Sequence, residues 1–535
     1  MAILSLIASL LLDISFSWAR MLVALLVSVV LGLFIGIYTA RHERAEKLIM
    51  PIVDILQTLP ILAFFPFVIF VIVASVPGYV GINIAVVFLI VTSMLWNIIF
   101  GSYEAVKTLP QEVSEVSEVY RMGNFERLRK IWIPASMPKV VEQAMLSWSI
   151  GLFYLVTSEI FSTANSTYTV KYGIGVALTN LALSGNYFDY GIGIAIFIIF
   201  VILTRALLFA PLETFFSPYN EQKQRKSRFK NFIHRFRTPK LPRVHWHIPK
   251  SIEKIEKMEF GHRHHRVSGA VNHAAAESGK ARSQLDRRIY AALAAAIAVV
   301  LFVSLYSFGV ISNKDIGFEY TVLIALAASF ARVWLAFAVI LLISVPVSVY
   351  LVFMSKHKNA YITLFQVLAS IPATILLPLI VLSLKNSPFH NEIVAFVIFV
   401  LSGIWYVIFG IMSNRNAIQS NILEVRDIFK IKGTKAWRYI YLQAIVPGLI
   451  TGAVTGIAAE WNASIVAEYF TSTAIGNGTV LTSVTIGMGK LLDTQLASGH
   501  LWLMALALIN LTVMIILINR LLWKRAYNRV AKVYK

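Results

Sequence analysis

The chain consists largely of long apolar runs that alternate with short polar segments. A helix needs about 20 apolar residues to cross a bilayer, and most of the runs reach or approach this length. They fall into two groups: Met21–Ala40, Ile61–Val76, Ile82–Phe100, Met145–Phe161 and Gly191–Phe209, followed by Tyr290–Val310, Leu323–Val352, Ile375–Leu384, Ile393–Met412, Ala444–Phe470 and Leu501–Leu522. The pattern predicts an all-α polytopic membrane protein with about 11–12 transmembrane helices.

The first residues, Met1–Leu12, are apolar but too few to cross a bilayer comfortably. We interpret them as an interfacial helix or as the remnant of a lost first span. They lack the basic start and the clear small-residue cleavage site of a secretory signal peptide, so no signal peptide is predicted.

Composition and charge also indicate a membrane protein. Of the 535 residues, 58% are hydrophobic and 14% are charged, whereas a soluble domain has about 25% charged residues. Most of the formal net charge of +21 flanks the apolar runs, as expected for cytoplasmic loops beside anionic lipid, so no nucleic-acid partner is predicted. The lack of cysteine excludes disulfides and thiolate metal sites. No catalytic triad, carboxylate dyad or metal-ligand cluster has a plausible spacing, so neither an enzyme nor a cofactor is predicted.

A basic segment separates the two groups of apolar runs. Between Glu221 and Arg288 it contains 18 Lys and Arg against 6 Asp and Glu, together with seven of the 11 histidines. This composition is typical of a solvated linker beside anionic headgroups, and a metal site at His262–His265 is the alternative interpretation. The predicted domains are a first repeat (1–210), a basic linker (211–288) and a second repeat (289–535).

The two groups are internal repeats that run parallel to each other. Arg20, Pro60 and Pro66 recur as Arg332, Pro372 and Pro378 at an offset of 312, and Glu115, Pro138 and Glu159 recur as Glu424, Pro447 and Glu468 at an offset of 309. In this arrangement the basic loop ends, the linker and the C-terminal tail share one side of the membrane. The positive-inside rule makes that side cytoplasmic.

A charged segment is duplicated between apolar runs, as EVSEVYRMGNFERLRKIWIPASMP (Glu115–Pro138, the first knob) and EVRDIFKIKGTKAWRYIYLQAIVP (Glu424–Pro447, the second knob). Each predicts an acidic helix, a glycine that breaks it (Gly123 or Gly433), and a second short helix that is basic and aromatic. Two short helices at an angle would form a compact docking surface. An ordinary amphipathic loop is the alternative, but it does not explain the duplication.

The knobs resemble the cytoplasmic signature of permease subunits of binding-protein-dependent ABC importers, which runs E-A-A, three residues, G, nine residues, I-x-L-P. The first knob keeps the spacing from Glu115 to the proline at Pro134, and the second keeps it from Glu424 to Gln443, which replaces the proline. The glycines stand two and three residues later than in the family pattern. A register fixed on the glycines would place Ser117 and Asp427 at the acidic position.

The resemblance implies a type I ABC importer transmembrane fold in each repeat, with ATPase coupling through the knobs. It assigns the coupling role to Glu115, Glu118, Gly123, Pro134, Glu424, Asp427, Gly433 and Gln443. Several further segments look like the nitrate, sulfonate and bicarbonate branch of the family, in its fused, duplicated form. They are Leu56–Phe70, Leu368–Leu382, Thr157–Phe161 and Glu460–Phe470, the last two each followed by Gly-x-Gly (Gly173/Gly175 and Gly476/Gly478).

Prolines and charges within the spans are candidates for the translocation path or its gate. The pairs Pro60/Pro66 and Pro372/Pro378 would kink or break helices and shape the gate, or they are plain packing kinks. Carboxylates inside a membrane are expensive unless they are paired or wet. For Glu159 and Glu468 we therefore favour pairing with Arg20 or Arg332, or capping of the following segment, over contact with substrate. The two arginines either attract an anion or snorkel to the interface.

These features predict the permease of an ATP-driven importer that forms the path for a small anion and lies, multi-pass, in the cytoplasmic membrane. The resemblance implies that two separate ABC ATPase subunits bind the cytoplasmic side, which is in line with the lack of a phosphate-binding loop in this chain. A solute-binding protein would bind the outer side, and anionic lipid would contact the linker. The alternative is an ion-gradient-driven secondary transporter, for which inverted repeats and charges at the membrane midplane are typical.

Overall fold

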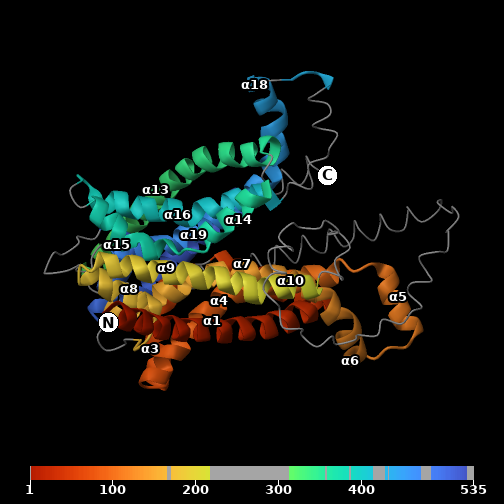
Figure 1. Cartoon of the computed structure of the whole chain (residues 1–535), viewed down its shortest axis with the longest axis horizontal. Helices are drawn as coiled ribbons and strands as arrows, with labels where there is room; N and C mark the ends of the chain where they lie inside the picture. Colours follow the sequence, from red (N-terminus) through yellow and green to blue (C-terminus); the bar gives the residue numbers. More distant parts are fainter. Residues whose placement is uncertain are drawn as a thin grey trace. The chain divides into compact units, whose positions relative to one another are not determined.

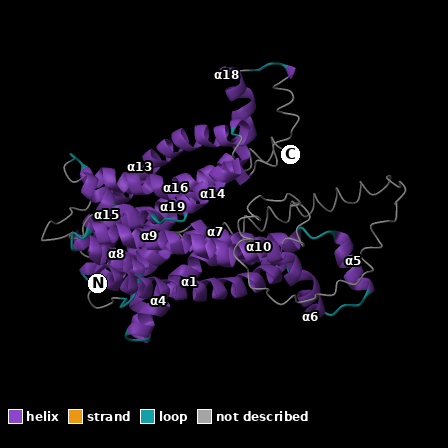
Figure 2. Ribbon diagram, viewed as in Figure 1, coloured by secondary structure: helices purple, strands orange, loops and turns teal. Residues whose placement is uncertain are grey.

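The computed structural model describes residues 2–58, 60–164, 170–216, 313–355, 358–384, 387–413, 428–431, 433–470, 484–523 and 525–526. Throughout these ranges the regular structure is helical (Figure 2). The chain divides into one unit formed by Met1–Lys223 with Tyr320–Lys535 and another formed by Gln224–Glu319. Only residues 313–319 of the latter are described, so the predicted span Tyr290–Val310 and most of the basic linker lie outside the described residues.

Helices of the first repeat run from red to yellow in Figure 1. They are α1 (Ala2–Arg41), α2 (Glu43–Thr58), α3 (Ile61–Ser75), α4 (Tyr79–Lys107), α5 (Gln111–Val119), α6 (Asn124–Arg127), the π-helical turn η1 (Leu128–Trp132), α7 (Ile133–Ala164), α8 (Ile174–Leu183), α9 (Tyr187–Thr204), the π-helical turn η2 (Arg205–Phe209) and α10 (Ala210–Phe216).

Helices of the second repeat run from green to blue. They are α13 (Asn313–Val349), the π-helical turn η5 (Tyr350–Met354), α14 (Lys358–Ala369), α15 (Ala373–Leu384), α16 (His390–Ser413), α18 (Gly433–Ala436), the π-helical turn η7 (Trp437–Tyr441), α19 (Leu442–Phe470), α20 (Met488–Ala497), α21 (Leu501–Ile518) and the π-helical turn η8 (Asn519–Trp523).

Eight helical stretches among the described residues are long and apolar enough to cross a membrane. They are Ile3–Arg41, Tyr79–Lys107, Asn124–Glu159, Tyr187–Phe216, Gly317–Met354, His390–Met412, Gly433–Glu468 and Trp502–Trp523. The predicted runs Ile61–Val76 and Ile375–Leu384 form α3 and α15, which have 15 and 12 residues and are shorter than a full crossing. The chain is therefore an all-α, multi-pass membrane protein.

The beginning of the chain differs from the sequence-based interpretation. Met1–Leu12 is not a separate interfacial helix, because α1 continues from Ala2 to Arg41 without a break. Leu10 and Ile14 on this stretch are buried. Asp13, the polar residue that ends the apolar run in the sequence, is half-buried and accepts a hydrogen bond from the backbone N–H of Gly173 at 3.2 Å.

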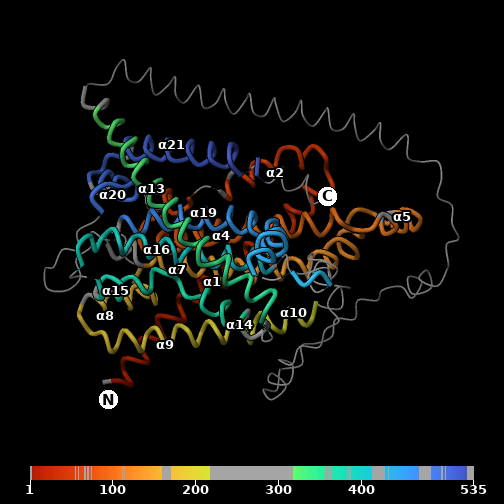
Figure 3. Tube along the Cα trace, turned by 90° about the horizontal axis from the view of Figure 1, so that it is seen from above, coloured from red at the N-terminus to blue at the C-terminus, as the bar shows by residue number. Residues whose placement is uncertain are grey.

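Each repeat contributes one short helix to the contact between the repeats. In the first repeat α1 packs on α4 and α7, and in the second α16 packs on α19. The short helix α3 packs on α4 of its own repeat and also on α19, α20 and α21 of the second. In the same way α15 packs on α16 of its own repeat and also on α7 and α8 of the first, as Figure 3 shows for α15. Pro60 and Pro372 stand immediately before α3 and α15, whereas positions 66 and 378 lie within these helices. The prolines thus mark the helices that form the interface between the repeats.

Candidate functional site

In the first knob, α5 is ended by Arg121 and not by Gly123. The N–H of Arg121 donates to the carbonyl of Glu118 at 2.9 Å, and the N–H of Met122 donates to that of Ser117 at 3.0 Å. This pair of bonds is the Schellman motif, which requires a left-handed residue at the first of the two positions. Arg121 has φ of +49°. Gly123 instead has φ of −68° and directly precedes α6.

The second knob has the same corner at the equivalent position. Lys430 also has φ of +49°, and it stands at the 309 offset from Arg121. Both lie six residues after the first Glu of their knob, where the family signature has its glycine. The left-handed position therefore follows the register that is fixed on the glutamates. Gly433 has φ of +63° as well, whereas Glu424 and Asp427 lie outside the described residues.

Both knobs expose large apolar side chains beside this corner. Val119 is 80% exposed and Ile428 at the same offset is 73% exposed, and each is followed by an exposed aromatic residue, Tyr120 or Phe429. These four positions lie outside the candidate spans. Exposed apolar patches outside the membrane indicate sites of protein contact. The predicted coupling residues Glu115 and Glu118 are exposed on the same short helix, α5, and Pro134 and Gln443 lie in the first turns of α7 and α19.

Each knob joins its long helix through a π-helical turn. η1 leads from α6 into α7, and η7 leads from α18 into α19 at the 309 offset. Such turns are rare and are frequently found at functional sites. In the first repeat the guanidinium of Arg41, the last residue of α1, lies 4.9 Å from the centre of the Trp132 ring in η1. The knob is thereby attached to two of the three core helices of its repeat.

Glu159, near the other end of α7, binds three groups from distant parts of the chain. Its side chain is completely buried. It accepts hydrogen bonds from Ser17 Oγ and Arg20 Nη1 at 2.7 Å each, and from the N–H of Gly175 at 2.8 Å. We call Ser17, Arg20, Glu159 and Gly175 the first clasp. It joins α1 to the N-terminus of α8, where a carboxylate also complements the helix dipole.

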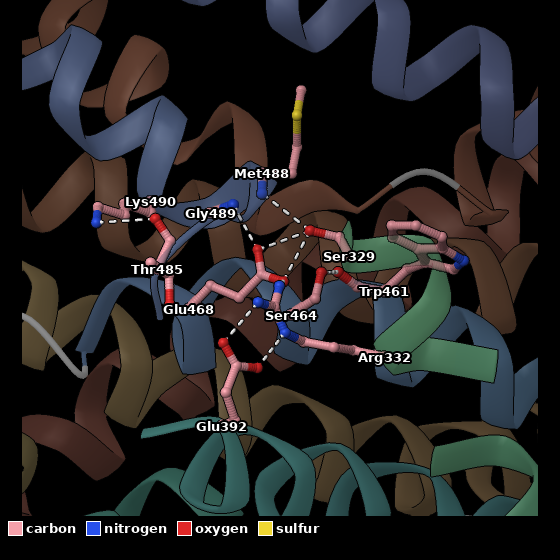
Figure 4. Close-up of polar contacts among 10 residues, drawn as sticks. All are labelled: Ser329, Arg332, Glu392, Trp461, Ser464, Glu468, Thr485, Met488, Gly489 and Lys490. Atoms are coloured by element: carbon pink, nitrogen blue, oxygen red, sulfur yellow. Dashed lines mark hydrogen bonds and ion pairs between the residues drawn. The ribbon is translucent and has the colours of Figure 1, made fainter. Parts of the chain in front are cut away.

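An equivalent second clasp consists of Ser329, Arg332, Glu468 and Gly489 (Figure 4). Completely buried Glu468 accepts hydrogen bonds from Ser329 Oγ at 2.7 Å, Arg332 Nη1 at 3.0 Å and the N–H of Gly489 at 2.9 Å. The ion pairs and the capping role favoured from the sequence are both present, one set in each repeat.

The two arginines differ in their remaining partners. Arg20 donates to the neutral Asn83 Oδ1 at 2.7 Å and to the carbonyl of Tyr172 at 2.6 Å. Arg332 donates to both carboxylate oxygens of Glu392, at 2.5 and 2.8 Å. Asn83 and Glu392 occupy equivalent positions in α4 and α16. The second arginine is therefore held by two carboxylates.

Close packing explains the glycines beside each clasp. A Cβ atom on Gly173 would lie 2.6 Å from Cδ of Glu159, and one on Gly487 would lie 2.6 Å from Cδ of Glu468. In the second repeat the Gly-x-Gly that meets the carboxylate is thus Gly487/Gly489. Gly476 and Gly478, which the sequence pattern suggested, lie outside the described residues.

Neutral polar side chains connect the two repeats. Tyr154 on α7 donates its hydroxyl to Asn462 Oδ1 on α19 at 2.7 Å, and Ser149 Oγ lies 3.1 Å from Ser370 Oγ. The hydroxyl of Tyr190 donates to the carbonyl of Ile375 on α15. Sequence reasoning missed these residues, because nothing in the pattern distinguishes them from the other polar residues of the same runs, and position 463, the counterpart of Tyr154, is alanine. No group of metal-ligating side chains occurs among the described residues.

Comparison with known proteins agrees with this architecture. Residues 28–218 and 343–526 both match the family described as "Binding-protein-dependent transport system inner membrane component".

Curated relatives match over shorter stretches. The glycine betaine/proline betaine transport system permease protein ProW of Escherichia coli is 28% identical over 188 residues, which are 35% of this chain and 49% of ProW. The nitrate import permease protein NrtB of Leptolyngbya laminosa is 24% identical, covering 28% of this chain and 51% of NrtB. The bicarbonate transport system permease protein CmpB of Synechococcus elongatus is 22% identical, covering 25% and 46%. The chain thus spans about half the length of these relatives.

The family match covers most of the chain and occurs once in each repeat. The chain therefore belongs to the inner-membrane components of binding-protein-dependent transport systems, as a fused duplicate of the permease.

Proposed function

We propose that the chain is the membrane permease of an ATP-driven importer and that each knob docks one separate ATPase subunit. The observation that carries the proposal is the match between the knobs. Arg121 and Lys430 share one uncommon backbone conformation, and Val119 and Ile428 beside them are exposed. Two equivalent copies of one partner require two equivalent surfaces. The parallel order of the repeats also favours this function over a secondary transporter, in which inverted repeats are typical.

Movement of a knob would reach the interface between the repeats through one continuous helical path. The first knob passes through η1 into α7, and α7 carries Tyr154 at the interface and Glu159 in the first clasp. With the basic knobs on the cytoplasmic side, the clasps lie toward the outside. The solute-binding protein would then dock at the end of the molecule that bears α8 and α20, and anionic lipid would lie against the basic linker.

The substrate we propose is a small solute with a planar oxyanion group, such as nitrate, bicarbonate or a carboxylate. The named relatives transport nitrate, bicarbonate or betaines, and each of these solutes carries such a group. Hydroxyl and amide groups of Tyr154, Asn462, Ser149 and Ser370 meet between the repeats. Hydrogen bonds from neutral groups can hold an oxyanion without trapping it by full charge.

Co-purification with candidate ATPase subunits tests the coupling. We expect the unaltered chain to retain an ATPase, and Glu115→Lys combined with Glu424→Lys to reduce both the binding and the transport-linked ATP hydrolysis. Val119→Glu combined with Ile428→Glu should act in the same way. The matched control is Glu43→Lys, a charge reversal at an exposed residue of α2 outside the knobs. If no ATPase binds the unaltered chain, or if the knob variants behave like the control, the proposal fails.

Uptake into proteoliposomes that contain the chain, its ATPase and its binding protein tests the substrate. Tyr154→Phe removes one hydroxyl, and we expect uptake of the oxyanion solute to fall about 5–10-fold, the usual effect of one lost hydrogen bond. Ser402→Ala is the control, because the hydroxyl of Ser402 bonds to a carbonyl of its own helix. Equal uptake by the Tyr154→Phe variant, or uptake of neutral sugars in preference to oxyanions, would contradict the proposed substrate class.

A further inference from the structure

Glu460 on α19 is a third buried carboxyl group, and it belongs to neither clasp. Its residue is 0% exposed. Neither carboxyl oxygen has a hydrogen-bond partner among the described residues. The side chain lies against Gly403 of α16, where a Cβ atom would be 2.8 Å from Glu460 Oε1, 2.9 Å from its Cγ and 2.7 Å from Cδ1 of Ile340 on α13. Glu460 thus occupies the core of the second repeat.

The first repeat fills the same place with an apolar side chain. The counterparts of Gly403 and Glu460 at the 309 offset are Met94 and Gly151. A Cβ atom on Gly151 would collide with Cε of Met94. The large side chain therefore comes from α4 in the first repeat and from α19 in the second. Because methionine fills this space without a polar atom, packing alone does not require a carboxyl group at Glu460.

No basic side chain among the described residues pairs with Glu460 to neutralise its ionised form. Several helices pack around Glu460, and on each of them we consider the titratable or charged residues nearest to the contact. These residues are Tyr406 and Glu392 on α16, Arg332 on α13, Glu468 on α19, Lys490 and Asp493 on α20, and Tyr154 on α7. The helix α3 has none. Arg332 is already bound by Glu392 and Glu468. Glu468 is eight residues from Glu460, which is about 12 Å along a helix. Lys490 is half-buried and donates to the carbonyl of Thr485, which is exposed.

An unpaired carboxylate in such surroundings is very costly, and a buried acid avoids the cost by taking up a proton. The clasps show the contrast, since Glu159 and Glu468 are equally buried but each accepts hydrogen bonds from an arginine, a serine and a backbone N–H.

We propose that Glu460 is a proton-binding site, which carries a proton while the second repeat is packed and loosens the contact of α19 with α13 and α16 when the proton is lost. The first repeat has no counterpart of this site, because Gly151 stands in its place. In the transport cycle proposed above, movement of the second repeat would respond to pH while movement of the first would not. The proton site itself follows from the packing and does not depend on that function.

Infrared spectroscopy of the purified full-length protein in lipid tests the protonation directly. The difference spectrum between the unaltered protein and Glu460→Gln at neutral pH should contain the carbonyl band of a protonated carboxylic acid. Glu392→Gln is the matched control, because its carboxylate is paired with Arg332, and its difference spectrum should contain carboxylate bands only. Carboxylate bands in the Glu460→Gln difference spectrum, as from an ion pair with a bound metal cation, would overturn the proposal.

Thermal unfolding across pH gives an independent readout. A proton held by the folded state and released on unfolding makes the folding equilibrium fall about tenfold per pH unit as the pH rises. We expect the melting temperature of the unaltered protein to decline more steeply from neutral to alkaline pH than that of Glu460→Gln. Should Glu460→Gln not fold, the Gly403→Met/Glu460→Gly double variant, which copies the packing of the first repeat, takes its place. The same steepness in the unaltered protein and these variants would refute the proton site.

Discussion

The two clasps and the middle of the two repeats have diverged to different degrees. In both clasps a buried glutamate accepts hydrogen bonds from a serine, an arginine and the second residue of a short helix. About two helical turns away, the first repeat has Met94 against Gly151 and the second has Gly403 against Glu460. The glutamate of each clasp holds the N-terminus of α8 or α20 in place, and its buried carboxylate must be satisfied by all of its hydrogen-bond donors. Such a contact tolerates little change. A packing contact tolerates exchange as long as its volume is kept.

The clasps also differ in the number of carboxylates that bind the arginine. Arg332 is held by Glu392 as well as Glu468, whereas the other described side-chain partner of Arg20 is the neutral Asn83. A buried charge that loses the only carboxylate bonded to it is costly, while one that keeps a second bonded carboxylate loses less. The two clasps should therefore respond unequally to the same substitution.

Glu159→Ala should give the largest effect, a loss of about 3–5 kcal/mol in unfolding free energy, because it leaves the Arg20 charge buried without a directly bonded carboxylate. Glu468→Ala should cost less, about 1–3 kcal/mol, since Arg332 keeps the two hydrogen bonds to Glu392. Chemical denaturation of the protein in detergent compares the two variants. Equal losses would show that Glu392 contributes nothing to the second clasp.

Exchanging the residues of the Gly403/Glu460 pair should show strong non-additivity. Glu460→Gly leaves a cavity, whereas Gly403→Met places a side chain where Glu460 already fills the space. Each variant should lose about 1–3 kcal/mol of unfolding free energy. The double variant reproduces the Met94/Gly151 arrangement, so its loss should be smaller than the sum of the single losses by about 0.5–3 kcal/mol. Unfolding of all three variants completes a double-mutant cycle. Additive losses would mean that the two repeats pack differently at this level.

Glu392→Asn converts the second clasp toward the first and should have a moderate effect. It replaces a bidentate carboxylate by an amide at the position that Asn83 occupies in α4. Because the Glu392 side chain is 36% exposed, solvent reduces the charge contribution, and we expect a loss of about 1 kcal/mol. The reverse change, Asn83→Glu, is the matched control. It should be near neutral, because Asp13 already lies close to Arg20 on the first side.

The sequence predicted the helices well and the contacts between them only in part. Apolar runs identified the long helices, although α3 and α15 are shorter than a full crossing, and the repeated offsets paired Arg20 with Arg332 and Glu159 with Glu468. The continuity of α1 was missed because Arg20 resembles the end of a span until its partner Glu159, 139 residues away, is known. Ser329 recurs at the same offset as Arg332, so the repeat itself could have revealed it. For Tyr154 and Asn462 no such signal exists, since contacts between the repeats follow no periodicity along the chain.

The corner of each knob should give the smallest effect, and the effect should be a gain. Arg121 and Lys430 hold a left-handed backbone conformation in which a side chain costs about 1 kcal/mol relative to glycine. Arg121→Gly should therefore stabilise the end of α5 by up to that amount, which slower amide hydrogen exchange at Met122, whose N–H closes the corner, would report.

Gly123→Ala provides the contrast, because Gly123 has an ordinary negative φ and open space around its Cα, and we expect almost no change. If Arg121→Gly keeps the fold and yet weakens ATPase binding in the co-purification test, the basic side chains of Arg121 and Lys430 are needed for binding. Such a result would explain why both knobs have a non-glycine residue in a left-handed conformation. If Gly123→Ala stabilised the protein more than Arg121→Gly, the helix-ending corner would lie at Gly123. The family signature would then align with the first knob in the register that is fixed on the glycines.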